Sequence, residues 1–105
     1  MGNFDEARGR AVMRLTPRDN VAVALRPLKA GETLTLDGVA MTVDRNIAPG
    51  QKLAAVAIAK GDVILKYGAP IGVAIINIAP GEHLNAHNVE TNYYMTQLPS
   101  ASSAG

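Results

Sequence analysis

The chain of 105 residues contains no cysteine and no tryptophan, and its only aromatic residues are one phenylalanine and three tyrosines. The absence of cysteine excludes disulfides and thiolate metal sites, and nothing points to an oxidising compartment. So few aromatic side chains leave little that could stack on bases or sugar rings. The hydrophobic core must therefore be aliphatic, built from valine, isoleucine, leucine and alanine.

Strong charge of one sign is missing as well. Ten basic and nine acidic residues give a net charge of +1, whereas nucleic acid and anionic membranes select clustered positive charge. No apolar run reaches the roughly 18–20 residues that span a bilayer, and the first twenty residues lack the apolar stretch of a signal peptide. We therefore expect a cytoplasmic protein that binds neither nucleic acid nor membrane.

A short pattern recurs four times along the chain: an apolar residue, two variable residues, glycine, two variable residues and a second apolar residue. The copies are LKAGETL (28–34), IAPGQKL (47–53), IAKGDVI (58–64) and IAPGEHL (78–84). Their glycines, at positions 31, 50, 61 and 81, are separated by 19, 11 and 20 residues. This spacing predicts an approximate internal duplication, with halves near 21–53 and 54–84.

Each copy predicts a tight turn of type I or II, because glycine accepts a positive φ at the third position and, in the two copies with Ala-Pro-Gly, proline presets φ at the second. Alternating or β-branched segments favour strands over 21–25, 39–43 and 71–76, while LAAVAIA (53–59) suits either a short helix or a strand. We predict a mostly β domain over residues 12–95. A flexible arm over 1–11 and a flexible tail or linker over 96–105 are expected from composition.

The stretch GEHLNAHNVETN (81–92) contains both histidines, His83 and His87. In a strand or in a helix these two residues would share a face, so two neutral imidazoles could reach one metal ion. A closed metal site normally needs three or four ligands, and Glu82 and Glu90 are the local candidates for the others. The alternative is a polar loop whose imidazoles bond to the backbone.

A second polar motif is KYGAPIG (66–72), in which Lys66 and Tyr67 stand at the end of a predicted strand. Their ammonium and phenol groups could donate to a carboxylate ligand. Alternatively, Tyr67 covers the core and Lys66 extends into solvent. Asp19 and Asn20, just before the first predicted strand, favour a structural turn. Serine occurs only in the tail, so a serine nucleophile paired with histidine is not indicated.

Four segments together resemble the SAF-type N-terminal domain of the altronate/galactarate dehydratase family, over about residues 16–92. They are DNVAVAL (19–25), IAPGQKLA (47–54), AIAKGDVILKYGAPIGVAI (57–75) and IAPGEHLNAHNVETN (78–92). The resemblance implies a small β-clip fold and a part in a hydro-lyase that removes water from a sugar acid to give a 2-keto-3-deoxy acid. It also implies a divalent metal, iron or manganese, in the complete enzyme, and a larger catalytic domain or subunit.

The family's pattern GEH-x-H-x-HN is matched at His83, His87 and Asn88, with Asn85 at its middle position, and the pattern KYG-x-PIG is intact. The resemblance implies that the substrate or an interface is contacted by Lys66, Tyr67, Asn85, Asn88 and Asn20, and that His83 and His87 bind metal. We expect no activity from this chain alone, and it could form homo-oligomers. The alternatives are a stand-alone SAF-type module that binds carbohydrate or serves assembly, and a free-standing metal-binding protein.

Overall fold

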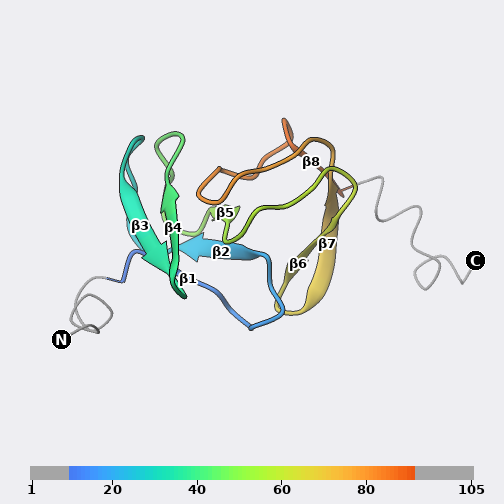
Figure 1. Cartoon of the computed structure of the whole chain (residues 1–105), viewed down its shortest axis with the longest axis horizontal. Coiled ribbons are helices and arrows are strands. Elements are labelled where there is room, and N and C mark those ends of the chain that lie inside the picture. Colours follow the sequence, from blue (N-terminus) through green and yellow to red (C-terminus); the bar gives the residue numbers. More distant parts are fainter. Residues whose placement is uncertain (1–9, 92–105) are drawn as a thin grey trace, which may run out of the picture.

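A computed structural model of the chain describes residues 10–91, which form eight short strands in three small antiparallel sheets. The central sheet has the order β1-β2-β5, β3 and β4 form a hairpin, and the third sheet has the order β6-β7-β8. The two long hairpins stand on either side of β2 (Figure 1). The strands are β1 (Val12–Met13), β2 (Val21–Ala24), β3 (Thr33–Leu36), β4 (Val39–Thr42), β5 (Lys52–Ala54), β6 (Val63–Lys66), β7 (Ala69–Ala74) and β8 (Val89–Glu90).

The mostly β architecture predicted from the sequence is confirmed, and it is consistent with a small β-clip domain. The four repeated turns are also confirmed, and all of them are of type II. In each turn the backbone N–H of the fourth residue donates to the carbonyl of the first, at 2.9–3.1 Å. The glycine at the third position has a φ between +88° and +93°, as a type II turn requires. These glycines are Gly31, Gly50, Gly61 and Gly81.

The predicted duplication is visible in the backbone pairing. Leu28 bridges Ile47 in the first half, and Ile58 bridges Ile78 in the second. The second half is one residue longer because the register of the β6–β7 hairpin shifts: Ile64 pairs with Gly72, but Leu65 pairs with Pro70. Ile71 is therefore the extra residue of a β-bulge. That bulge explains why the glycine spacing is 20 in the second half and 19 in the first.

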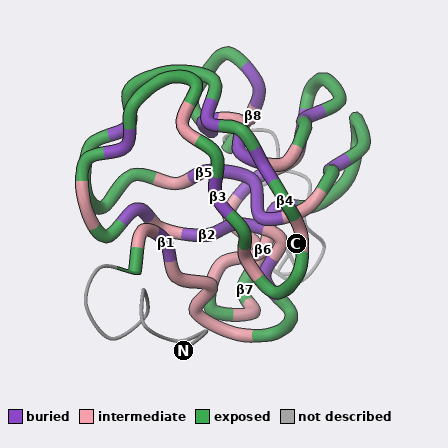
Figure 2. Tube along the Cα trace, turned by 60° about the vertical axis from the view of Figure 1, so that its left-hand side comes forward, coloured by how far each residue is buried: buried purple, intermediate pink, exposed green. Residues whose placement is uncertain are grey.

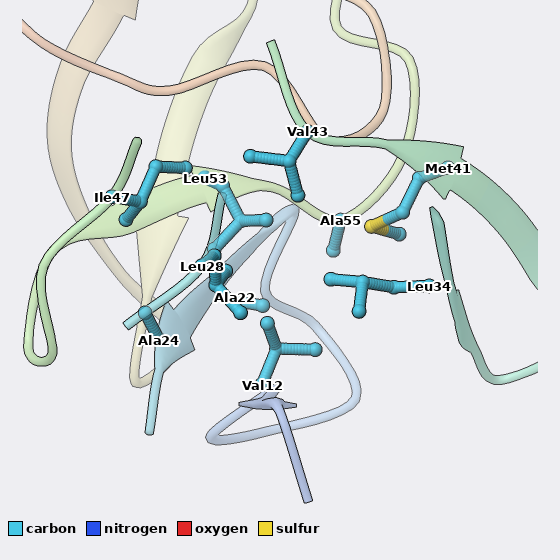
Figure 3. Packing of buried hydrophobic residues seen from close by; sticks show 10 residues of the cluster. All are labelled: Val12, Ala22, Ala24, Leu28, Leu34, Met41, Val43, Ile47, Leu53 and Ala55. Atoms are coloured by element: carbon cyan, nitrogen blue, oxygen red, sulfur yellow. The ribbon is translucent and has the colours of Figure 1, made fainter. Parts of the chain in front are cut away.

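The two halves have separate aliphatic clusters that meet at β2. Residues alternate between opposite faces of a strand, so Ala22 and Ala24 enter the first cluster whereas Val21 enters the second. Figure 3 shows the first cluster, in which Leu28 and Leu53 pack beside Ala22. Buried segments run through the middle of the molecule and exposed ones through the outer turns (Figure 2). Both clusters are aliphatic, as the composition predicted.

Some boundaries differ from the predictions. The open choice over 53–59 is resolved as the end of β5 followed by a bend, and β7 covers 69–74 rather than 71–76. The short strands β1 and β8 were not predicted, because two residues carry no periodic signal. Of the expected arm and tail, only Arg10 and Ala11 lie within the described residues. In the described part of the chain, no helix has the length and apolar character needed to cross a bilayer.

Candidate functional site

The carboxylate of Asp19 binds the turn of the β6–β7 hairpin. It accepts hydrogen bonds from the backbone N–H groups of Tyr67, at 2.9 Å, and Gly68, at 2.7 Å, and from the N–H and hydroxyl of Thr16. Only 3% of Asp19 is exposed. Burial raises its pKa, but the hydrogen bonds from Gly68, Tyr67 and Thr16 outweigh this, so the net pKa lies below the ordinary value. The carboxylate of Asp19 is therefore ionised, and it holds the turn of this hairpin in place; we call this contact the Asp19 clamp.

Tyr67 needs such a clamp because its backbone is in the left-handed region, with a φ of +59°. A bulky residue rarely adopts that conformation. The first half places Asp37 and Gly38 at the corresponding turn, also with positive φ, and Asp-Gly is a sequence that this type I′ turn prefers. The tyrosine is 68% exposed, so its ring does not stabilise the core. An unfavoured backbone that presents an exposed aromatic side chain is a feature found at functional sites.

Asn20 holds the neighbouring strand. Its side-chain oxygen accepts from the N–H of Leu65 at 2.8 Å, and its amide group donates to the carbonyl of Val63 at 2.9 Å. The two bonds complete one edge of β6, as another strand would do. Asn20 thus positions the strand that leads into Lys66 and Tyr67, and its own polar atoms are engaged in doing so.

The second polar motif forms a turn that is organised by Asn88. Its side-chain oxygen accepts from the N–H of Asn85, at 3.0 Å, and its amide group donates to the carbonyl of His83, at 2.8 Å. Asn88 has no exposed surface. Its side chain is a structural support for the turn, whereas Asn85 and His87 are exposed on it.

His83 and His87 differ in their surroundings: His83 is buried and His87 is exposed. Residues 85–88 form a turn rather than a continuous strand or a helix, so the geometry expected from either periodicity is absent. His83 is 7% exposed, and its Nδ1 is buried without a hydrogen-bond partner. Burial lowers its pKa and nearby Arg45 lowers it further. This imidazole is therefore neutral at pH 7.

A neutral imidazole with an unpartnered nitrogen has the chemistry of a metal ligand. However, residues 10–91 contain no group of three or more histidine, aspartate or glutamate side chains placed to hold an ion. The pair His83 and His87 therefore does not fit a metal centre on its own. A site that used these residues would need ligands from another part of the protein.

The structure separates the two polar motifs. The turn that contains Lys66 and Tyr67 precedes β7, whereas β8, which follows His83–Asn88, pairs with the far end of β7 at Val73 and Ala74. Six residues of strand, roughly 17 Å at 3.3 Å per step, lie between these ends (Figure 1). Asp19 and Asn20 contact the β6–β7 hairpin near Lys66 and Tyr67. Asn85 and Asn88 lie in the turn with His87, near the other end of β7.

A pocket of about 270 Å³ lies beside the second motif. Among the residues that line it, Lys52 was not predicted as a site residue, and the bulge residue Ile71 was noted only as part of the KYG-x-PIG pattern. The signal for Ile71 was present in the unequal glycine spacing. No sequence pattern pointed to Lys52, because its neighbours in the pocket come from β6, β7 and the turn that follows residue 84.

Comparison with known proteins identifies the family. Residues 10–92 match the family described as the altronate/galactarate dehydratase SAF domain. The chain belongs to this family. It is 47% identical over 74 residues to an altronate dehydratase of Escherichia coli strain K12, and 41% identical over 91 residues to an altronate dehydratase of Bacillus subtilis strain 168.

The SAF domain is only a small part of these two relatives. The aligned segments cover 70% and 87% of this chain, but only 15% and 18% of the two dehydratases. A third relative is the (2R)-sulfolactate sulfo-lyase subunit alpha of Chromohalobacter salexigens, with 35% identity over 77 residues. That alignment covers 66% of this chain and 80% of the subunit. The SAF domain thus occurs both within long enzymes and as most of a short subunit.

Proposed function

We propose that this SAF domain is a small subunit or N-terminal domain of a sugar-acid dehydratase of the altronate/galactarate type, and that it docks on a larger catalytic subunit or domain. The observation that carries the proposal is the coverage: the same domain makes up less than a fifth of two altronate dehydratases and four fifths of a lyase subunit. The assembly would act in the cytoplasm, where sugar acids are metabolised.

The reaction in this proposal is a β-elimination. A base removes the proton α to the carboxylate, the β-hydroxyl leaves as water, and the resulting enol becomes a 2-keto-3-deoxy acid. We assign the base to the larger part of the enzyme, together with the iron or manganese ion that the family resemblance implies. The described residues of this chain instead line the edge of the site that the two parts share. Tyr67 is presented at one end of β7, and the turn with Asn85 and His87 at the other.

The proposal is tested by co-expressing the tagged chain with candidate large subunits, and by assaying the purified complex on a panel of aldonic and aldaric acids. We expect a stable complex that dehydrates at least one acid, and no turnover by either part alone. Appreciable dehydration by this chain alone would contradict the docking role. Binding of neutral carbohydrate by a chain that captures no large subunit would instead support a stand-alone module.

A further inference from the structure

Duplication gives this fold an internal comparison, because a feature present in only one half is not required by the repeated pattern itself. Two differences stand out. The second half has the bulge at Ile71, which the β3–β4 hairpin lacks. It also continues from its last glycine turn into the polar turn Asn85–Asn88, which ends at β8. Both differences meet at the pocket of about 270 Å³, because Ile71, Asn85 and Ala86 all line it.

The base of this pocket is aliphatic. Ile64 is fully buried and Leu84 is 6% exposed, and Ile71 and Val89 add further apolar surface. Gly72 lets β8 approach closely, since a Cβ at that position would lie 2.8 Å from Val89. The bulge and this close approach therefore set the shape of the base.

The polar groups at the pocket are Lys52, Asn85 and Thr91, and none of the lining residues is acidic. Lys52 belongs to β5, and its carbonyl accepts from the N–H of Leu84 at 3.0 Å, which fixes its backbone against the pocket. Its ammonium has no carboxylate partner within residues 10–91. The side-chain oxygen of Asn85 accepts from Ala86, so its NH₂ group is the donor left for a ligand.

The wider surroundings also favour an anion. Arg45, Lys52 and His87 all lie close enough to His83 to affect its charge state, and Asp44 is the acidic group beside them. Asp44 is already paired with Arg45 at 3.4 Å. Among residues 10–91, Lys52 therefore has no acidic partner and lies next to the aliphatic base.

We propose that this pocket binds the carboxylate end of a small organic acid, with Lys52 pairing with the carboxylate, Asn85 and Thr91 bonding to the adjacent oxygen atoms, and the carbon chain resting on Ile71 and Leu84. The volume lies just below the roughly 300–1,000 Å³ of ordinary ligand pockets, which suits part or all of a six-carbon acid. That the acid is an aldonic or aldaric acid rests on the proposed function. The pocket itself does not depend on catalysis.

The test is an NMR titration of the ¹⁵N-labelled 105-residue chain with sodium altronate up to about 50 mM, with the neutral polyol altritol as the control ligand. We expect the backbone signals of Leu84, Asn85, Ala86 and Thr91 to shift with altronate, with a dissociation constant of about 1–10 mM. Altritol should leave these signals in place because it has no carboxylate. Absence of shifts with altronate, or equal shifts with altritol, would overturn the proposal.

Matched variants separate the pocket from general charge. Lys52→Gln should weaken altronate binding about tenfold, the size of one charge-assisted contact. Lys60→Gln, on the exposed turn of the repeat, should leave it unchanged. Ala86→Leu keeps the charge but fills the pocket from an exposed position, and should also weaken binding. Binding that is the same in Lys52→Gln and Lys60→Gln would overturn the assignment to this pocket.

The outcomes distinguish this inference from the proposed function. Shifts around Lys52 with no dehydration by any assembled enzyme would support the pocket and remove the proposed function. Dehydration by a complex whose KM for the acid is unchanged by Lys52→Gln would keep the function and overturn the pocket. A Lys52→Gln variant that loses affinity for the large subunit but keeps its KM would show that an acidic side chain of the partner occupies the pocket, which also overturns the proposal.

Discussion

The carboxylate of Asp19 accepts hydrogen bonds from the backbone of Tyr67 and Gly68, although 48 and 49 residues separate the partners along the chain. This contact joins the segment before β2 to the turn of the β6–β7 hairpin. It allows a tyrosine to occupy a position where the other half of the duplication has Asp37. The same contact supports the fold and fixes the place of an exposed aromatic ring.

Replacing Asp19 by asparagine should lower the free energy of unfolding by about 2 kcal/mol, because hydrogen bonds to a charged acceptor are worth about 1.5–3 kcal/mol. Urea denaturation at pH 7 measures this. Asp37→Asn is the matched control: its carboxylate lies in the other hairpin turn, is 58% exposed and pairs with Arg14, so we expect a change of about 0.5 kcal/mol. Equal effects of the two substitutions would contradict the clamp.

The Asp19 contribution should also depend on pH. The pKa of Asp19 is below its ordinary value in the folded state, because the hydrogen bonds from Gly68, Tyr67 and Thr16 outweigh the effect of burial. Its stabilisation is therefore complete above the unfolded pKa of about 4, and is lost as the pH falls through the lower folded pKa. Urea midpoints between about pH 6 and pH 2 should fall less steeply in Asp19→Asn than in the wild type.

Tyr67→Asn should weaken binding to a larger subunit without lowering the stability of this chain. Asparagine tolerates the left-handed conformation better than tyrosine, and the ring is largely exposed, so the stability should stay equal or rise by about 0.5 kcal/mol. If the ring contacts a larger subunit, its removal should weaken the complex at least about tenfold. Calorimetry of the complex and urea denaturation of the chain measure the two effects. Unchanged affinity would exclude Tyr67 from the interface.

Alanine substitutions at Gly81 and Gly50 should differ strongly, although both glycines have a φ near +90°. A Cβ at Gly81 would lie 2.4 Å from the carbonyl oxygen of Thr42, whereas one at Gly50 would meet no atom within 4 Å. Gly50→Ala should lower the free energy of unfolding by about 1–2 kcal/mol for its backbone alone. Gly81→Ala should lose about 1–3 kcal/mol more from overpacking. Similar thermal midpoints would show that the halves are not in contact at Thr42.

The His83 imidazole should titrate below its ordinary pKa, because burial and then Arg45 disfavour its charged form. The unfolded chain takes up this proton near pH 6.5, so His83 contributes fully to stability above that pH. The contribution falls as the pH drops from there towards the folded pKa. NMR of the imidazole protons measures the titration, with His87→Gln identifying the second set of signals. A His83 signal that titrates at or above the ordinary value would contradict the buried position.

Local features were predictable from the sequence. The four turns follow from glycine at a fixed position, because glycine accepts a positive φ, and in two of them proline also presets φ at the position before that glycine. The aliphatic core follows from composition. The duplication follows from the spacing of Gly31, Gly50, Gly61 and Gly81. These features can be predicted without knowing which strands pair.

The sites depended on contacts between distant residues, which periodicity does not encode. His83 and His87 were expected to share a face, but the buried side chain of Asn88 bonds to Asn85 and His83 and turns the chain between the two imidazoles. Lys52 reaches the pocket because β5 lies beside Leu84. The sequence by itself determined the turns, the duplication and the aliphatic interior. Only the tertiary structure decided which histidine is buried, which aspartate holds the turn of Tyr67 and where Lys52 meets an apolar pocket. Long-range strand pairing and one β-bulge set those positions.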